Sequence, residues 1–181
     1  MHTSSREEGA MASSFSFRHA NMIDKELLTQ TVMEAMDGTD MFPVDIKIGK
    51  DNNIVVEVGS ATGVDIDACV RITRRIEEVF DRDVEDYELE VGSAGITSPM
   101  KVREQFEMNI GNDVEVLTRD GRKLHGVLSS VLPGESRTDV TFTITRQVKV
   151  KEEGKKKPVI TDEELTLRSD ECKYVIYDLK F

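Results

Sequence analysis

The chain has 181 residues, of which 38% are hydrophobic and 33% are charged, and its 35 acids against 24 bases give a net charge of −11. This composition supplies a buried core and excludes both a wholly disordered chain and a generally basic nucleic-acid binder. No apolar run approaches the ~18 residues of a membrane helix, and two distant cysteines, Cys69 and Cys172, exclude a small disulfide-stapled protein.

Residues 1–21 are rich in serine and alanine and show no hydrophobic period. They lack the apolar stretch of roughly 7–15 residues that a signal peptide needs. We expect a disordered leader that derives from an upstream start codon or from the expression vector, with Met22 as the working start. Two of the three histidines fall in this leader. Only His125 remains, which argues against a histidine metal site and a Ser-His-Asp triad.

The negative charge is concentrated in one half of the sequence. Residues 22–98 hold 18 acids and 7 bases, a net of −11, whereas residues 99–181 hold 15 of each. This step predicts an acidic N-terminal domain (22–98) and a C-terminal domain (99–181) that meet near Pro99. An acidic domain repels phosphate backbones and attracts basic proteins. A merely solvated acidic surface is the alternative interpretation.

Two helices and three strands are predicted in the first half. Asp24 is the predicted cap of a helix that ends at residues 37–38. Its apolar face consists of Leu28, Val32, Ala35 and Met36. Residues 44–48 and 54–58 then alternate between apolar and polar types around a polar turn, which predicts a hairpin.

Asp65 is the predicted cap of the second helix. The predicted apolar face consists of Ile66, Cys69, Val70, Ile76 and Phe80, with Cys69 as a small buried hydrophobe. A basic cluster lies on the other side, at Arg71, Arg74 and Arg75. These arginines either pair within the helix, as Arg74 with Glu78, or contact phosphate.

The third predicted strand covers residues 87–91, with Tyr87, Leu89 and Val91 facing inward. Glu88 and Glu90 face outward, either as a solvated strand face or as a general acid/base pair. Two helices on one side of this sheet give an αββαβ layer. Residues 92–95 match the GxxG pattern of KH domains. Because they are uncharged and follow a strand instead of joining helices, we interpret this match as accidental.

The second half predicts four or five short strands, at residues 114–117, 124–128, 140–145, near 165–167 and from 173 to the end. An Asp-Gly turn at residues 119–122 joins the first two, and Gly126 suits a strongly bent strand. Such strands indicate an SH3-like or Sm-like β-barrel. Together with the αββαβ layer of the first half, this barrel places the whole chain in the α+β fold class. Residues 149–157 are predicted to form a long exposed loop. Lys155, Lys156 and Lys157 in it either contact RNA or are simply solvated, and His125 is predicted to be structural.

One segment, residues 87–96, resembles the signature of the bacterial ribosome maturation factor RimP family. That signature runs roughly Tyr-x-Leu-Glu-Val-Ser-Ser-Pro-Gly, followed by Arg-Pro-Leu, and the chain has YELEVGSAGI. Further matches lie at Asp65, Asp67 and Cys69, at Asp83-Val84, at Phe106 with Ile110-Gly111, and at residues 126–128.

Three positions depart from the family pattern. Gly92 replaces a serine, Ala94 replaces the proline, and Ser98 stands where the arginine usually is. A contact made by that arginine therefore does not carry over. Loss of the proline also loosens the loop, because proline fixes φ.

The resemblance implies an αββαβ domain followed by an SH3-like barrel, without enzyme activity or cofactor. It also implies a cytoplasmic protein that binds the free small (30S) ribosomal subunit and helps it mature, with a basic small-subunit ribosomal protein as partner. We expect a monomer without membrane contact. The candidate partner-binding residues are Asp83, Asp86, Glu88, Glu90, Ser93, Gly95, Lys155, Lys156 and Lys157.

The charge distribution suggests how such a factor works. The acidic domain would hold a basic ribosomal protein transiently, since charge complementarity raises the association rate more than the affinity. The barrel would add a second weak contact, for which ribosomal RNA is the candidate partner, and two contacts on one chain raise avidity. The competing hypothesis is an Sm-like or KH-like RNA-binding module, which needs a basic groove or an aromatic platform.

Overall fold

The computed structural model describes residues 23–151, 153–154 and 157–179. The predicted leader, residues 1–21, lies outside this range, as do Lys155 and Lys156. The elements of the first half are α1 (Lys25–Ala35), β1 (Met41–Ile48), η1 (Lys50–Asn52), β2 (Asn53–Ser60), α2 (Ile66–Val79) and β3 (Glu88–Ser93). Those of the second half are α3 (Arg103–Glu107), β4 (Asp113–Thr118), β5 (Lys123–Pro133), β6 (Val140–Val150), β7 (Val159–Arg168), η2 (Ser169–Glu171) and β8 (Cys172–Tyr177).

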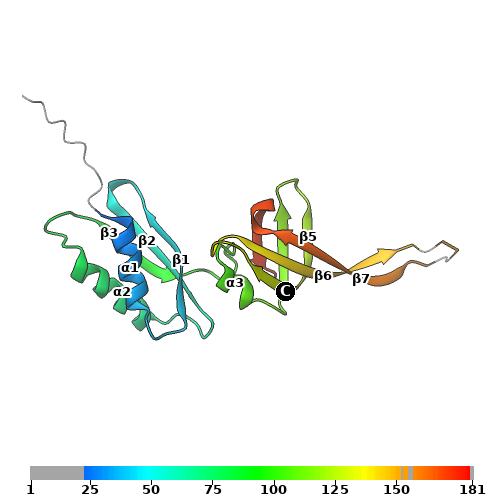
Figure 1. The fold of residues 1–181 in the computed structure, drawn as a ribbon, viewed down its shortest axis with the longest axis horizontal. Coiled ribbons are helices and arrows are strands. Elements are labelled where there is room, and N and C mark those ends of the chain that lie inside the picture. The colour runs from blue at the N-terminus through cyan, green and yellow to red at the C-terminus, as the bar shows by residue number, and fades with distance from the viewer. Residues whose placement is uncertain (1–22, 152, 155–156, 180–181) are drawn as a thin grey trace, which may run out of the picture.

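In the first half, α1 and α2 cover one face of a three-stranded sheet, and we call this unit the N-terminal layer (Figure 1). The strand order is β1-β2-β3, with β1 and β2 paired as an antiparallel hairpin and β2 and β3 paired in parallel. A parallel pair needs a crossover connection, and α2 provides it. The predicted αββαβ order and the hairpin are thus confirmed.

Aspartate side chains cap both helices of the N-terminal layer, as predicted. The backbone N–H of Leu27 donates to Asp24 Oδ1 at 2.9 Å, and that of Ala68 donates to Asp65 Oδ1 at 2.6 Å. These bonds satisfy N–H groups that no helical carbonyl reaches. Beneath α1 and α2 lies one hydrophobic cluster, which also takes in the inward residues of the sheet, including Ile54.

The buried face of α2 differs from the predicted one. Its inward row is Ala68, Ile72 and Ile76, whereas Ile66 is 81% exposed and Val70 is 39% exposed. Residues spaced four apart lie on one side of a helix, and the sheet lies on the side of the small Ala68. The prediction is confirmed at Ile76 and at the partly buried Phe80 and wrong at Ile66 and Val70, because it followed the bulkier side chains at the start of the helix.

Two further predictions on α2 need correction. Cys69 is half-buried instead of fully buried. Glu78 pairs with Arg75 at 3.2 Å, not with Arg74, and the same Arg75 reaches Glu34 of α1 at 3.1 Å. Arg75 lies on the side of α2 that faces α1, so it can bridge two carboxylates. A guanidinium held in this way is less available for phosphate.

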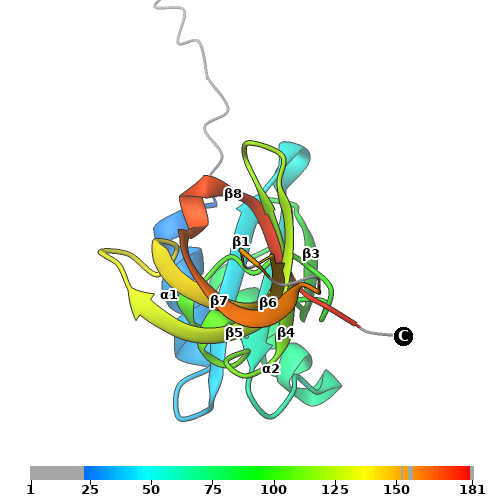
Figure 2. The same cartoon turned by 90° about the vertical axis from the view of Figure 1, so that its right-hand side faces the viewer.

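The second half contains a five-stranded antiparallel sheet, which we call the C-terminal sheet, with the order β7-β6-β5-β4-β8. Figure 2 shows that it is strongly curved. Within the described residues its edge strands β7 and β8 do not pair with each other, so the sheet stays open. The mixed α+β class is confirmed. The expectation of short strands is wrong for β5, β6 and β7, which have 11, 11 and 10 residues.

Short helix α3, which the sequence analysis missed, closes the core of the C-terminal sheet. Its Phe106 is 1% exposed and its ring centroid lies 5.2 Å from that of Phe142 in β6. A Cβ on Gly126 would lie 2.8 Å from the carbonyl oxygen of Thr145, so β5 approaches β6 too closely there for a side chain. The core of this sheet shares no residue with the core of the N-terminal layer.

The predicted loop at residues 149–157 is shorter than expected, because strand pairing reaches into it. β6 and β7 pair as far as Val150 and Val159, whereas β5 pairs with β6 only over residues 140–145. The outer parts of β6 and β7 therefore project as a two-stranded ribbon away from the N-terminal layer (Figure 1). Among the helices of the described residues, none has the length and apolar character to cross a membrane.

Candidate functional site

The segment between α2 and β3 carries the candidate acidic residues. It is closed by Tyr87, which is 2% exposed and whose hydroxyl donates to the carbonyl of Phe80 at 2.9 Å. The Arg82 guanidinium lies 4.5 Å from the centre of the Tyr87 ring and donates to the Tyr87 carbonyl at 3.0 Å. Burial raises the pKa of the Tyr87 phenol, which keeps it a neutral donor. These contacts give the segment a fixed path.

A second contact ties this segment to the turn between β1 and β2. The Asn52 amide donates to Glu85 Oε1 at 2.7 Å and to the carbonyl of Asp86 at 3.2 Å. Asn52 has a positive φ of 55°, a conformation that asparagine tolerates better than most residues. The turn thus holds the acidic segment against the edge of the sheet.

Asp83 and Asp86 project from this segment, and Glu88 and Glu90 follow on β3. All four are exposed, and within the described residues none of them has an ion pair. Glu88 and Glu90 lie opposite Asn53 and Val55 of β2, on the face of the sheet that the helices leave open. We call these four residues the acidic cluster. The predicted outward orientation of Glu88 and Glu90 is confirmed, whereas partner binding by the four residues stays a prediction.

Other carboxylates of the N-terminal layer are engaged in internal contacts. Ion pairs take up Glu34, Asp45, Glu57, Glu77 and Glu78. With 7 bases against 18 acids in residues 22–98, pairing within this half cannot neutralise it. The negative surface is thus narrower than the charge count suggests, and the acidic cluster is one part of it that has no ion pair among the described residues.

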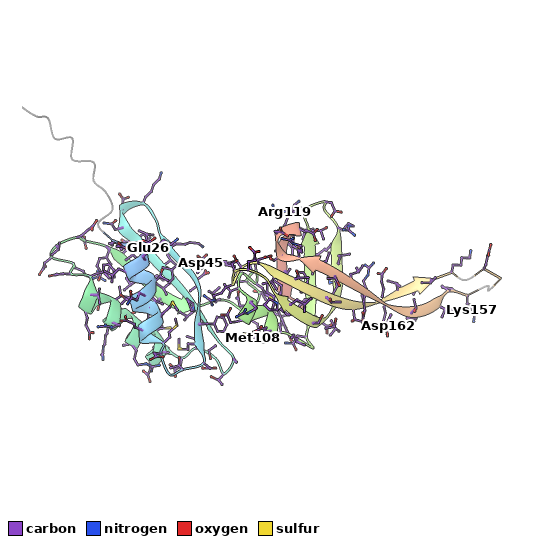
Figure 3. All side chains as sticks on the ribbon, viewed as in Figure 1. Glu26, Asp45, Met108, Arg119, Lys157 and Asp162 are labelled. Carbon is purple, nitrogen blue, oxygen red and sulfur yellow. The ribbon has the colours of Figure 1, made fainter. Side chains whose placement is uncertain are left out.

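The two halves are joined by a lysine that the sequence analysis did not identify. Lys101 Nζ lies 2.9 Å from Asp45 Oδ2 and 2.7 Å from Glu57 Oε2, on the same open face of the sheet. Asp45 is labelled in Figure 3, on the side of the N-terminal layer nearer to the C-terminal sheet. Burial raises the pKa of Asp45, but hydrogen bonds from Lys101 and Lys47 outweigh it and leave the pKa lowered. This lysine therefore both neutralises charge and fixes the junction.

An arginine from the β5–β6 connection forms the second part of the junction. Arg137 donates through Nη2 to the carbonyl of Pro43 at 2.9 Å and through Nε to Glu104 Oε1 at 2.8 Å. Its own carbonyl accepts from the N–H of Arg103 at 2.7 Å. Pairs separated by 94 residues leave no periodic signal, so sequence reasoning could not have found them.

Ser93 and Gly95 lie at the end of β3, the strand that carries Glu88 and Glu90 of the acidic cluster. The N–H of Ala94 donates to the carbonyl of Val58 at 2.9 Å and continues the β2–β3 pairing, so residues 92–95 do not connect two helices as a KH loop would. Ser93 and Gly95 line a groove of about 520 Å³ between the two halves, together with Ile96, Met108 and Tyr177. The structure thus separates the candidate residues into an acidic cluster and a groove.

Of the three candidate lysines, the structure describes only Lys157, which lies far from the N-terminal layer (Figure 3). Lys157 is labelled at the tip of the ribbon in Figure 3, and Lys155 and Lys156 lie outside the described residues. His125 is exposed, with Nδ1 2.9 Å from Asp178 Oδ2. In the part of the chain that the structure describes, no three His, Cys, Asp or Glu side chains gather as metal ligands would.

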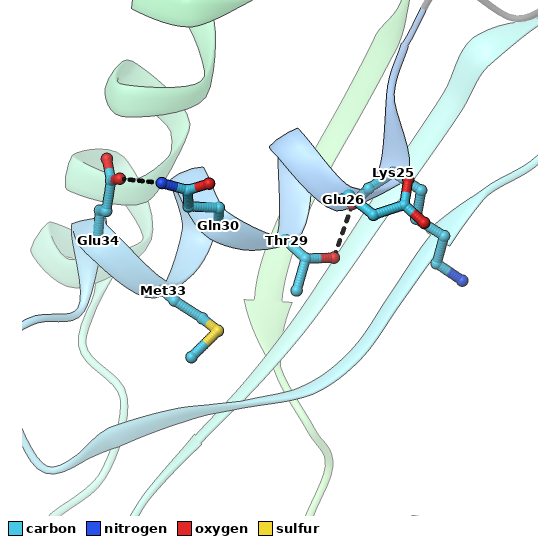
Figure 4. A pocket seen from close by; sticks show the side chains of 6 residues that line it. All are labelled: Lys25, Glu26, Thr29, Gln30, Met33 and Glu34. Carbon is cyan, nitrogen blue, oxygen red and sulfur yellow. Dashed lines mark hydrogen bonds between the residues drawn. The ribbon is translucent and has the colours of Figure 1, made fainter.

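A hollow on the outer side of α1 is a weaker candidate for a binding site than the acidic cluster or the groove. Figure 4 shows that its lining comes from successive turns of a single helix. The Gln30 amide donates to Glu34 at 3.0 Å and the Thr29 hydroxyl donates to the carbonyl of Lys25 at 2.8 Å. These bonds lie within the helix, and the Glu34 carboxylate also pairs with Arg75 of α2, so the polar groups do not converge on a ligand.

Comparison with known proteins identifies the family. A family model described as the RimP N-terminal domain matches residues 30–97. The ribosome maturation factor RimP of Porphyromonas gingivalis (strain ATCC BAA-308 / W83) is 41% identical over 155 residues, which are 86% of this chain and 98% of that protein. The chain belongs to the RimP family of ribosome maturation factors.

More distant RimP relatives match over a shorter stretch. The RimP proteins of Flavobacterium psychrophilum and Christiangramia forsetii are 35% and 31% identical over 94 and 105 residues. These stretches cover 52% and 58% of this chain, and 59% and 67% of the two relatives. The family membership expected from residues 87–96 is confirmed.

The junction of this RimP-family chain makes its stability depend on pH. We expect Lys101→Met to lower the free energy of unfolding by about 1 kcal/mol near neutral pH, a value reduced because the groups are partly exposed. The lowered pKa of Asp45 means that its contribution is present above its ordinary value of 3.8 and is lost as the pH falls through the folded value. The raised pKa of Lys101 means that its contribution is complete below 10.5 and is lost above the folded value.

Urea denaturation of both proteins across the pH range tests this expectation. The difference between them should be constant from about pH 5 to pH 9 and shrink towards zero in acid. Lys50→Met is the matched control, since Lys50 is exposed and has no ion pair among the described residues. A difference that stayed unchanged at pH 2 would show that Lys101 acts through packing instead of charge.

Proposed function

We propose that this protein binds the immature small ribosomal subunit in the cytoplasm and promotes its maturation by holding a basic small-subunit ribosomal protein on the acidic cluster. The observation that carries this proposal is the exposure of Asp83, Asp86, Glu88 and Glu90 without ion pairs among the described residues. Unpaired carboxylates on a fixed scaffold attract a basic partner and align it before contact. Membership of a family of ribosome maturation factors supports the choice of partner.

We also propose that the chain is divided into two domains. The N-terminal layer and the C-terminal sheet act as two domains that meet near Pro99, and the curved sheet serves as an SH3-like barrel. Two cores without a shared residue support this division. The junction made by Lys101 and Arg137 then sets the orientation at which both domains meet the subunit.

Two further contacts complete the proposed interface of the monomer. Ser93 and Gly95 in the groove contact the held protein beside the acidic cluster, and the lysines at 155–157 contact ribosomal RNA. Binding one assembly state more tightly than the mature subunit shifts the population towards that state and allows release afterwards. The role is binding without catalysis, since an acid/base pair needs a shielded site to tune it and Glu88 and Glu90 are exposed.

The experiment neutralises the acidic cluster by changing Asp83 and Asp86 to Asn and Glu88 and Glu90 to Gln. Gradient sedimentation should show the unchanged protein with free small subunits and not with joined ribosomes. For the variant, we expect association with immature small subunits to slow by roughly tenfold at low salt, because steering by the four charges is lost. The difference should fade as added salt shortens the screening length.

A control variant removes the same charge elsewhere. It neutralises the exposed acids Glu26, Asp67, Glu135 and Glu164. This control should associate nearly as fast as the unchanged protein. Equal slowing of both variants would attribute the effect to net charge, and no slowing of the cluster variant would overturn the assignment of the acidic cluster.

A further inference from the structure

In the described part of the chain the outer β6–β7 ribbon pairs with no third strand, and only its base, at Arg146, packs beside Gly126 of β5. β5 pairs with β6 up to Thr145, and beyond it the pairs from Arg146↔Glu163 to Val150↔Val159 have no third strand beside them. Five residues of strand add roughly 17 Å of reach. Isolated two-stranded hairpins are only marginally stable in water, so a ribbon of this length is a costly feature for a purely structural connection.

The base of the ribbon is fixed and its outer part is exposed. An ion pair of 2.7 Å joins Arg146 Nε to Glu163 Oε2 where the ribbon leaves the sheet. Further out, Ile160 is 59% exposed, Val150 is 43% exposed and Val159 is 37% exposed. Exposed apolar strand residues are unfavourable in water and are typical of surfaces that meet another molecule. The ribbon thus projects from the sheet and presents apolar side chains for contact with another molecule.

The tip of the ribbon is the positive end of an acidic molecule. Residues 149–157 hold five lysines and two glutamates, a net of +3, whereas residues 22–98 carry −11. Of these lysines, Lys149, Lys151 and Lys157 belong to the described residues, and all three are exposed. Figure 3 places Lys157 at the far end of the ribbon, with Asp162 part of the way along it. The charge therefore changes sign along the long axis.

We propose that the β6–β7 ribbon is an arm that reaches into ribosomal RNA and contacts its phosphates through Lys149, Lys151 and Lys157. This inference rests on the proposed function, and it assigns the RNA contact to a formed structural element in place of a loop. Phosphates are the partner that lysines recognise as point charges. A basic ribosomal protein would be repelled by the same tip, which argues against a protein partner at this end.

The mode of recognition follows from the side chains present. No aromatic residue lies between positions 146 and 163, so the ribbon has no platform on which bases could stack. Contact is then electrostatic and does not depend on the RNA sequence. The apolar side chains of Val150, Val159 and Ile160 pack against the sugar and base edges beside the phosphates. Such binding depends strongly on salt, because each neutralised phosphate releases a counterion.

The test measures binding of the full chain to immature small subunits and to naked small-subunit ribosomal RNA as salt is varied. The variant changes Lys149, Lys151 and Lys157 to Gln. We expect the slope of log K against log salt to fall by about 2 with single-stranded RNA, and affinity to fall at least tenfold at low salt. The matched control removes three exposed lysines elsewhere, at Lys25, Lys50 and Lys173, and should keep the original slope.

The outcomes distinguish this inference from the proposed function. Failure of the unchanged protein to bind immature subunits would overturn the proposed function itself. Binding by the unchanged protein, with equal slopes for the ribbon variant and the control, would overturn the ribbon assignment alone. A photo-crosslinker at Thr161 should label ribosomal RNA, and labelling of a ribosomal protein instead would also overturn it. Aggregation of the variant without loss of RNA affinity would show that the lysines only protect an exposed strand edge.

Discussion

Phe106→Ala is expected to lower the free energy of unfolding of the C-terminal sheet by about 3–5 kcal/mol. Phe106 is 1% exposed, and its ring lies against that of Phe142, with centroids 5.2 Å apart. α3 has five residues and cannot be stable alone, so the packing of Phe106 holds it together with the contacts of Arg103 and Glu104 to Arg137. Truncation leaves a cavity beneath β6 that the sheet cannot fill.

Hydrogen exchange measured by mass spectrometry resolves this effect by segment. Amides of β4, β5 and β6 should lose protection by roughly a hundredfold or more, since 1.4 kcal/mol corresponds to a factor of ten. Amides of β1, β2 and β3 should keep theirs, because the two cores share no residue. Phe106→Leu is the matched control and should cost no more than about 1.5 kcal/mol. Equal loss of protection in both halves would contradict the division into two units.

Local patterns predicted the N-terminal layer well. Capping by Asp24 and Asp65 and the alternation at residues 44–48, 54–58 and 87–91 depend only on neighbours in sequence. The same logic failed on α2, where Ile66 and Ile72 are equally apolar but only Ile72 is buried. Which side of a helix faces the sheet is decided by tertiary packing, and a single helical turn does not determine it.

Tertiary features were less accessible to sequence reasoning. Lys101 pairs with residues 44 and 56 positions earlier, and Arg137 reaches a carbonyl 94 positions earlier. No spacing rule connects such residues. The ribbon was missed for a different reason, since Gly154 and Pro158 indicate a loop and conceal the strand pairing that surrounds them.

The candidate site was predictable in part because the net charge of a segment can be counted without knowledge of the fold. The excess of acids in residues 22–98 indicated a negative surface, but only the structure shows that Asp45 and Glu57 are neutralised by Lys101. The acidic cluster is exposed and without ion pairs among the described residues of the N-terminal layer, whereas the basic ribbon projects on the far side of the C-terminal sheet (Figure 1). Two weak contacts of opposite sign on one rigid chain would each be reversible, while together they raise avidity for a particle that offers both.

Ile54→Ala is expected to destabilise the N-terminal layer by about 2–5 kcal/mol. Ile54 is fully buried at the start of β2, the central strand, where it pairs with Ile48 and Leu89 beneath the helices. Because β2 holds β1 and β3 together, its loosening also releases the register that displays Glu88 and Glu90. The change should therefore disturb the arrangement of the acidic cluster on β3 without altering its charge.

The measurement combines hydrogen exchange with binding to immature small subunits. Protection should fall in β1, β2, β3 and α2 and persist in the C-terminal sheet, with Ile54→Val as a control that costs about 0.5–1.5 kcal/mol. At a temperature where only the N-terminal layer of the variant is unfolded, steered association should be lost while the ribbon still gives salt-dependent affinity for RNA. Unchanged association with the layer unfolded would mean that charge alone, without the fixed arrangement on β3, is enough to recruit the basic partner.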